Sequence, residues 1–227
     1  MGENNGTKKT NELITVIVTA LNEEQFIGRC IRSLLAQTFQ RDKYKIIVVN
    51  DGSTDRTSYA LELFQEDITV IQNEKNLGLP ASVNKAIQQV KTPYFVRVDA
   101  DDYVSKHFLL FLYVFISENP NMDAVACDYN IIDDEGLLIS KQNCFDNPIA
   151  CGIIFHTNHI RELGMYDEKF LMHEERDLRI RFLKKYNMNR LQIPLYRYRK
   201  HSGSMTNDKQ AMEIHLKKLH LKHSLDK

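Results

Sequence analysis

Residues Leu13–Ala20 read LITVIVTA, an almost continuous run of β-branched and other apolar residues. Such a run predicts a strand that is buried on both faces, as in a parallel sheet covered by helices. A helix is expected to follow, because apolar residues recur at helical spacing from Phe26 to Leu35 and Asn22 is a suitable N-cap. The stretch therefore predicts the first strand and helix of an α/β unit.

The alternation of strand and helix continues toward residue 100. Further strands are predicted at Lys45–Asn50, Ile68–Gln72 and Tyr94–Val98, and helices at Asp55–Phe64 and Leu79–Val90. Strands that alternate with helices predict an α/β domain whose central sheet is mostly parallel and flanked by helices.

The second half of the chain is less regular. A helix is predicted at Lys106–Ser117, a strand near Ala124–Tyr129 and a turn at Asp134–Gly136, followed by a stretch of mixed character. No repeat, linker or low-complexity segment divides the sequence. We therefore expect one domain with a mixed C-terminal half.

The charge of the 227 residues is balanced, with 30 Lys and Arg against 30 Asp and Glu. This balance argues against a general nucleic-acid-binding protein. The net charge is nevertheless +7 from Arg161 onward and −7 before it. An acidic and a basic part can meet at a site for a metal and phosphates, although two solvated surfaces would explain the pattern equally well.

Several features favour a cytoplasmic protein. The longest apolar run, Phe108–Ile116, is shorter than the roughly 20 residues that a membrane-spanning helix needs. The first 13 residues lack the apolar stretch of a secretory signal. Four cysteines follow neither a CxxC nor a zinc-finger spacing, so they are expected to be reduced, mostly buried thiols. They are Cys30, Cys127, Cys144 and Cys151.

Polar loops follow three of the predicted strands. Ligands of open parallel sheets bind beyond the carboxyl ends of the strands. The loops Thr19–Glu24, Asn50–Thr54 and Asp99–Asp102 are therefore expected to line one site.

The last loop places the carboxylates of Asp99, Asp101 and Asp102 within four residues. Their mutual repulsion is costly unless a cation compensates it, and Mg²⁺ or Mn²⁺ takes oxygen ligands of this kind. The alternative is that Asp102 begins the next helix and the other two are solvated. Asp51 follows the second strand at the same edge, where its carboxylate could accept hydrogen bonds from a nucleobase or ribose. Asp55 fits better as the N-cap or first-turn acid of the next helix.

Four stretches together resemble the inverting family 2 glycosyltransferases of the GT-A (Rossmann-like) fold. In chain order they are VIVTALNEEQFIGRCIRSLLAQTF, IIVVNDGSTDRT, NEKNLGLPASVNKAI and YFVRVDADD. The resemblance covers roughly residues 13–200. It implies a nucleotide-diphosphate sugar as donor, a UDP-sugar in the first place, and a divalent metal, Mn²⁺ or Mg²⁺.

The resemblance also implies roles for individual residues of the nucleotide-binding half, residues 13–102. Asp101 would be the metal ligand that holds the diphosphate, and Asp99 would lie near the ribose. The other expected donor contacts are Thr19, Leu21, Glu23, Asp51, Asn76 and Gly78.

The acceptor and catalytic half, residues 103–205, contains the stretch HEERDLRIRF. It resembles a family segment in which a Glu-Asp pair precedes a helix, and the second acid of that pair is the catalytic base. Glu175 is therefore the candidate base. Because the family usually has Asp there, Glu174 stays open as the alternative. Asp177 and Arg181 are expected to pair across one helical turn.

Arg199 and His201 lie in a segment that resembles the family's Arg-x-His. The resemblance implies that Arg199 contacts the donor and that His201 reaches the metal or diphosphate. The last predicted element, residues 206–227, is a basic amphipathic helix. Such a helix more often packs on its own domain, but contact with an anionic membrane surface is the alternative. Residues 1–12 are expected to be a flexible tail.

The expected function is metal-dependent, inverting transfer of a sugar to a hydroxyl of a saccharide or lipid-linked acceptor. Surface polysaccharide biosynthesis is the expected setting, in the cytoplasm or at the inner face of the membrane. The alternative is a nucleotide-binding module of the same fold without transfer activity. A nucleotidyltransferase is a third possibility, which the missing Gly-rich basic loop disfavours.

Overall fold

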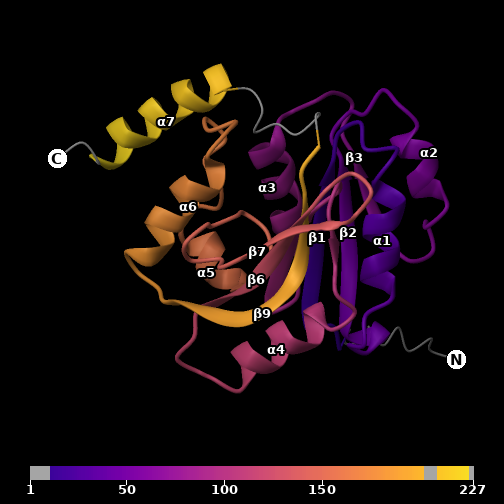
Figure 1. Cartoon of the computed structure of the whole chain (residues 1–227), viewed down its shortest axis with the longest axis horizontal. Helices are drawn as coiled ribbons and strands as arrows, with labels where there is room; N and C mark the ends of the chain where they lie inside the picture. The colour runs from indigo at the N-terminus through magenta and orange to yellow at the C-terminus, as the bar shows by residue number, and fades with distance from the viewer. Residues whose placement is uncertain (1–10, 202–208, 225–227) are drawn as a thin grey trace, which may run out of the picture.

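The computed structural model describes residues 11–201 and 209–224. Their strands form a nine-stranded sheet in the order β3-β2-β1-β4-β8-β6-β9-β5, and β7 pairs with β6 beside this path. The predicted α/β class with helices around a central sheet is confirmed (Figure 1).

The first half of the sheet is parallel, as predicted. Strand β1 (Ile14–Ala20) pairs in parallel with β2 (Tyr44–Asn50) and β4 (Tyr94–Asp99), and β2 pairs in parallel with β3 (Thr69–Gln72). All seven residues of β1 are buried. The carboxyl ends of β1, β2 and β4 therefore lie side by side, which brings the three predicted loops to one edge.

Helices cover both faces of these strands. In Figure 1, α1 (Ile27–Leu35) and α2 (Thr57–Glu62) lie on one side, and α3 (Leu79–Gln89) lies on the other. A short 3₁₀ turn, η1 (Arg41–Lys43), leads into β2.

The prediction of Asn22 as the N-cap of α1 is wrong. The cap position is Phe26, and Asn22 has a left-handed backbone with φ 58°. Its side-chain oxygen instead accepts a hydrogen bond from the Thr54 amide at 2.8 Å. The residue thus ties the first loop of the site to the second.

The second half of the sheet is mixed. Strand β6 (Ala124–Ile132) is parallel to β9 (Met188–Arg199) and antiparallel to β7 (Leu138–Gln142) and β8 (Ile153–His156). Strand β8 is also antiparallel to β4 and so joins the two halves. The remaining elements are β5 (Tyr103–Val104), α4 (Phe108–Ser117), α5 (Thr157–Glu162), α6 (Glu174–Leu183) and α7 (Lys209–His223).

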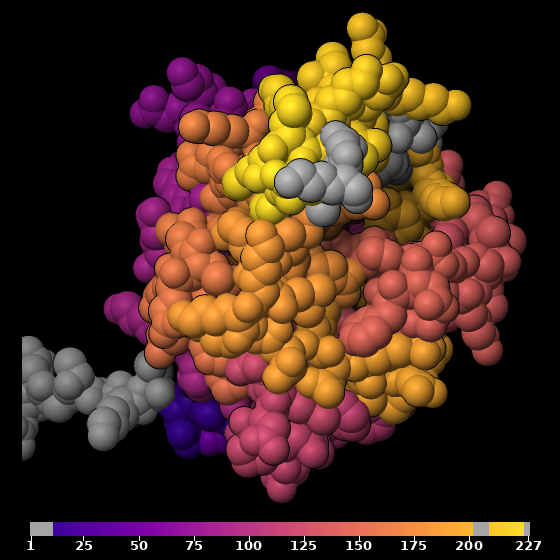
Figure 2. Space-filling model, turned by 90° about the vertical axis from the view of Figure 1, so that its left-hand side faces the viewer, coloured from indigo at the N-terminus to yellow at the C-terminus, as the bar shows by residue number. Residues whose placement is uncertain are grey.

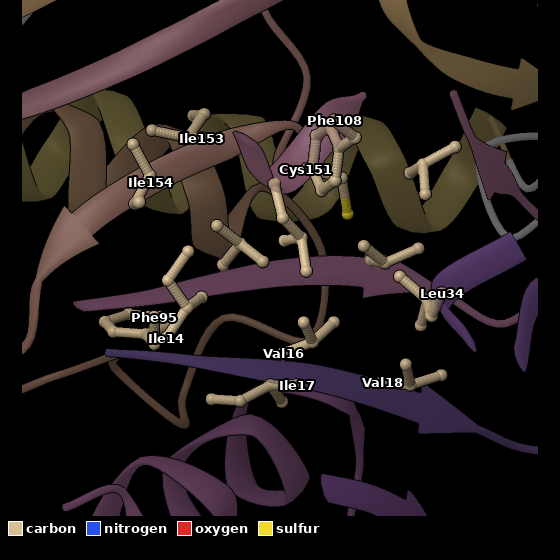
Figure 3. Packing of buried hydrophobic residues seen from close by; sticks show 14 of the residues in the cluster. Ile14, Val16, Ile17, Val18, Leu34, Phe95, Phe108, Cys151, Ile153 and Ile154 are labelled. Carbon is tan, nitrogen blue, oxygen red and sulfur yellow. The ribbon is translucent and has the colours of Figure 1, made fainter. Parts of the chain in front are cut away.

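One hydrophobic core runs through both halves. Figure 3 shows Val16 of β1, Phe95 of β4 and Ile154 of β8 among the packed side chains of this core. The four cysteines are buried free thiols, as predicted. The core therefore fixes β4, which ends at the predicted metal loop, between the two halves of the sheet.

Helix α7 packs on the protein through polar contacts. Lys222 Nζ lies 2.6 Å from Asp177 Oδ1 and 2.8 Å from Asp167 Oδ2, and Leu219 is buried. Within residues 11–201 and 209–224, no helix is both long and apolar enough to cross a membrane. The expected boundary between domain and terminal helix, at 205/206, lies outside the described residues, as do most of the expected tail residues.

Candidate active site

The three acids of the loop after β4 have different surroundings. Asp102 is buried, and its carboxylate accepts hydrogen bonds from Tyr196 Oη at 2.6 Å and from the Arg199 amide at 2.7 Å. Burial, with Asp101 and Asp99 nearby, raises the pKa of Asp102 well above its ordinary value. Asp102 therefore anchors the loop to β9.

Asp101 meets the predicted metal residue of the C-terminal segment. His201 Nε2 lies 3.0 Å from Asp101 Oδ2, although the two residues are a hundred positions apart in the chain. Burial and the neighbouring Asp99 raise the pKa of Asp101, and His201 opposes this shift. The fold thus brings together the two residues that were predicted to hold the metal.

Glu23 adds a further carboxyl group to the same edge. Burial raises its pKa to about 8, and Asp101, Asp99 and Asp55 contribute to the shift in that order. The carboxyl groups of Glu23, Asp99 and Asp101 are close enough that Asp99 raises the pKa of both Glu23 and Asp101. Such a group of acids is stabilised by a bound positive charge.

These residues fit a divalent metal that shares its coordination with a diphosphate. Among the described residues there is no cluster of three or more His, Cys, Asp or Glu arranged as metal ligands. Mg²⁺ is commonly held by one or two carboxylates together with substrate phosphates, so Asp101 and His201 would form only the protein part of the site. A metal bound there would supply positive charge for the diphosphate.

A buried arginine connects this edge to α6. Arg97 on β4 is 3% exposed; its Nη2 lies 3.0 Å from Asp99 Oδ1, and its Nη1 lies 3.0 Å from Glu174 Oε1. The sequence analysis did not single out Arg97. A cation within an otherwise apolar strand, directly before a cluster of acids, is the signal that could have identified it.

The two candidate bases differ in their contacts. Glu174 is 4% exposed and is held by Arg97; burial raises its pKa to about 7, although Arg97 opposes the shift. Glu175 is partly exposed and lines a cavity beside α6. Glu174 is thus enclosed within the structure, whereas Glu175 is open to a ligand. The predicted pair of Asp177 and Arg181 is present at 2.8 Å.

The buried carboxylate of Asp51 organises the loop before α3. It accepts hydrogen bonds from Asn73 Nδ2 at 2.8 Å, the Leu77 amide at 2.9 Å and the Gly78 amide at 3.0 Å. Asn76 Oδ1 also accepts a hydrogen bond from the Gly78 amide. Gly78 has φ +91°, and a Cβ there would lie 2.9 Å from Leu171 Cδ2, so glycine is required.

The remaining predicted donor contacts lie at the same edge. Thr19 is nearly buried near the end of β1, and Leu21 is 38% exposed in the loop that follows. The hydrogen bonds of the Arg199 side chain go to the carbonyl oxygens of Asp101, Asp133 and Asp134. Donor contact by each of these residues stays a prediction. The contacts of Arg199 identify it as a support of the metal loop.

Tyr196 is a second residue that sequence reasoning missed. Its hydroxyl donates to Asp102 and accepts a hydrogen bond from the Asp99 amide at 3.1 Å, so it contacts both ends of the metal loop. Nothing in the sequence pattern distinguishes it from Tyr198, the other tyrosine of β9.

Comparison with known proteins identifies the family. The sequence profile described as "Glycosyl transferase family 2" matches residues 15–202. The chain therefore belongs to the family 2 glycosyltransferases, as the resemblance predicted.

Two curated relatives are named for poly(glycerol phosphate) and poly(ribitol phosphate). The teichoic acid poly(glycerol phosphate) polymerase of Staphylococcus epidermidis is 30% identical over 170 residues, which are 65% of this chain and 22% of that protein. The poly(ribitol-phosphate) beta-glucosyltransferase of Bacillus spizizenii is 37% identical over 110 residues, or 47% of this chain and 17% of that protein. The chain thus matches only about a fifth of the length of these relatives.

Solved structures agree with the fold. The structure of S. aureus TarS residues 1–349 with UDP-GlcNAc has a TM-score of 0.79 at 21% identity and covers 92% of this chain and 66% of its own. The mannosyltransferase PcManGT from Pyrobaculum calidifontis, in complex with GDP-Man and Mn²⁺, has a TM-score of 0.73 at 18% identity. It covers 94% of this chain and 64% of its own. At these identities the likeness concerns the fold, which is the predicted GT-A fold.

Proposed function

We propose that this chain is a metal-dependent inverting glycosyltransferase that moves a sugar from a nucleotide-diphosphate sugar to a hydroxyl of a saccharide or lipid-linked acceptor. The observation that carries the proposal is the group of side chains at one sheet edge. There Arg97 joins Asp99 to the N-terminal turn of α6, which contains Glu174 and Glu175, and His201 meets Asp101.

In this proposal the donor lies across the carboxyl ends of β1, β2 and β4. Asp51 and the loop that it holds would meet the nucleoside, and Asp99 would lie near the ribose. Asp101 and His201 would hold Mn²⁺ or Mg²⁺ at the diphosphate. The complexes of TarS with UDP-GlcNAc and of PcManGT with GDP-Man and Mn²⁺ support this donor class, with a UDP-sugar as the first candidate.

Glu175 would act as the base. It takes the proton from the acceptor hydroxyl while the oxygen of that hydroxyl forms a bond to the anomeric carbon. The bond between the anomeric carbon and the diphosphate oxygen breaks on the opposite face, and the nucleotide diphosphate leaves with the electron pair. One carboxylate is sufficient for this step.

The teichoic acid polymerase and the poly(ribitol-phosphate) glucosyltransferase among the relatives support surface polysaccharide biosynthesis as the setting, and a cytoplasmic location belongs to the same proposal. The test is release of nucleotide diphosphate from a panel of donor sugars with Mn²⁺, with and without poly(ribitol phosphate) or simple glycosides as acceptors. Metal-dependent release that an acceptor accelerates would support transfer. Donor binding without any release would instead favour the alternative, a nucleotide-binding module.

A further inference from the structure

A cavity of about 330 Å³ lies beside α6, between this helix, β8 and α7. Figure 2 looks onto this side of the molecule, where α7 in yellow lies over the orange chain that includes α6. Buried apolar side chains form much of the lining, among them Ile153, Phe155, Phe182 and Leu219. The volume is at the lower end of the range for small-molecule sites, so the cavity fits a segment of an apolar chain.

Cationic side chains also line this cavity. Arg176 is exposed in the first turn of α6, and Arg179 follows one turn later. Within the part of the chain that the structure describes, neither guanidinium has a carboxylate at ion-pair distance. The Arg179 guanidinium contacts Met188 Sδ at 3.1 Å and lies 5.9 Å from the centroid of the Phe145 ring. An apolar cavity with two such arginines is complementary to an amphiphile that has an anionic group.

The carboxylate of Glu175 lines the same cavity. If Glu175 is the base, the acceptor hydroxyl must come within hydrogen-bond reach of it. The rest of the acceptor then has the apolar space directly beside its reacting end. A purely saccharide acceptor would leave this apolar surface without a partner.

We propose that the cavity holds the apolar chain of a lipid-linked acceptor, with a phosphate at Arg176 and Arg179 and the accepting sugar at Glu175. This inference rests on the proposed glycosyl transfer and narrows its acceptor to a sugar that is linked to a lipid through phosphate. It gives α7 a role as one wall of the acceptor site.

Calorimetric titration tests the inference with three probes: farnesyl phosphate below its micellar concentration, farnesol and inorganic phosphate. Farnesyl phosphate is expected to bind at least about tenfold more tightly than either other probe, because both the chain and the phosphate find partners. Equal binding of phosphate alone would identify a simple anion site and overturn the proposal.

Three variants locate the binding. Ala150→Leu fills the cavity and is expected to abolish farnesyl phosphate binding. The double change Arg176→Gln and Arg179→Gln is expected to weaken it about tenfold or more. Lys184→Gln removes a cation from the exposed end of α6 and is the matched control. Unchanged affinity in the double variant, whose sites lie partly in solvent, would overturn the proposal even if Ala150→Leu failed to fold.

Light scattering measures the oligomeric state and so tests whether a second copy of the chain occupies the cavity. A dimer of the parent that Ala150→Leu dissociates would assign the cavity to a second copy of the chain and overturn the proposal. The melting temperature with nucleotide sugar and Mn²⁺ is measured on the same samples. If nucleotide sugar raises the melting temperature but farnesyl phosphate does not bind, this inference alone is contradicted. If farnesyl phosphate binds but no nucleotide sugar raises the melting temperature, the donor assignment is contradicted.

Discussion

Arg97 Nη1 lies 3.0 Å from Glu174 Oε1, and this buried ion pair fixes the start of α6 against the carboxyl end of β4. The same guanidinium holds Asp99. The candidate base, Glu175, follows directly after Glu174, which is bound to Arg97 of β4. The ion pair thus connects the strand that leads into the predicted metal loop with the helix that contains the candidate base.

Replacing Arg97 should destabilise the protein. Arg97→Gln leaves Glu174 buried without its counter-charge, a change that typically costs about 3–5 kcal/mol. Arg97→Lys should retain only part of the stabilisation, because one ammonium cannot reach both carboxylates as a guanidinium does. Urea unfolding measures the loss. An unchanged free energy of unfolding in Arg97→Gln would show that the ion pair does not hold α6 in place.

The two acids of α6 should respond differently to loss of charge. Glu175→Gln is expected to lower the rate of transfer by roughly 10²- to 10⁴-fold without loss of donor binding, because the base is gone. Glu174→Gln should act mainly on stability, since Glu174 contacts Arg97. Initial rates and donor affinity are compared with those of Glu118→Gln, a change at the exposed C-cap residue of α4. If Glu174→Gln abolished turnover and Glu175→Gln did not, the base would be Glu174.

The metal loop should depend on Tyr196. Tyr196→Phe removes the hydroxyl that donates to buried Asp102, and an unsatisfied buried acceptor costs about 1–3 kcal/mol. Thermal and urea unfolding give the change in stability, with Tyr59→Phe, a change at an exposed tyrosine of α2, as the control. A loss no larger than that of the control would mean that Asp102 finds another donor.

The docking of α7 should weaken in acid. Burial would raise the pKa of Asp177, but hydrogen bonds from Lys222 and His223 and the charge of Arg181 outweigh it and hold the pKa below 3.8. The unfolded chain therefore takes up this proton first as the pH falls, so the stabilisation is complete well above pH 3.8 and declines below it.

Melting temperatures between pH 7 and pH 2.5 measure this contribution. Asp177→Asn should melt at a lower temperature than the parent at pH 7, and its melting temperature should fall less on acidification. Asp42→Asn, at an exposed position, should follow the parent. Parallel curves for the parent and Asp177→Asn would contradict the assignment.

The first half of the fold was predictable because its strands are continuous apolar runs at regular spacing. Strand β1, for example, was predicted to within one residue. The mixed half was not predictable in this detail, because β6 pairs with three strands. The order of the strands there depends on contacts between residues far apart in sequence.

The site was predictable only to the level of residue types at strand ends. Asp101 and His201 came from the family resemblance, and their contact is a result of the fold. Arg97 and Tyr196 act through long-range hydrogen bonds, which no local pattern encodes. The role of Asn22 was misread because its side chain bonds to another loop instead of capping its own helix.

The donor site is the central claim, and thermal shift with nucleotide-diphosphate sugars tests it most directly. The parent, Asp101→Ala and the exposed control Asp42→Ala are melted with a panel of these sugars, with and without Mn²⁺. A ligand that binds the folded form must raise the melting temperature. We expect one nucleotide to stabilise the parent and the control only when Mn²⁺ is present, and to leave Asp101→Ala unchanged. If no nucleotide shifts the parent, or if Asp101→Ala responds as the parent does, the donor and metal assignment is wrong.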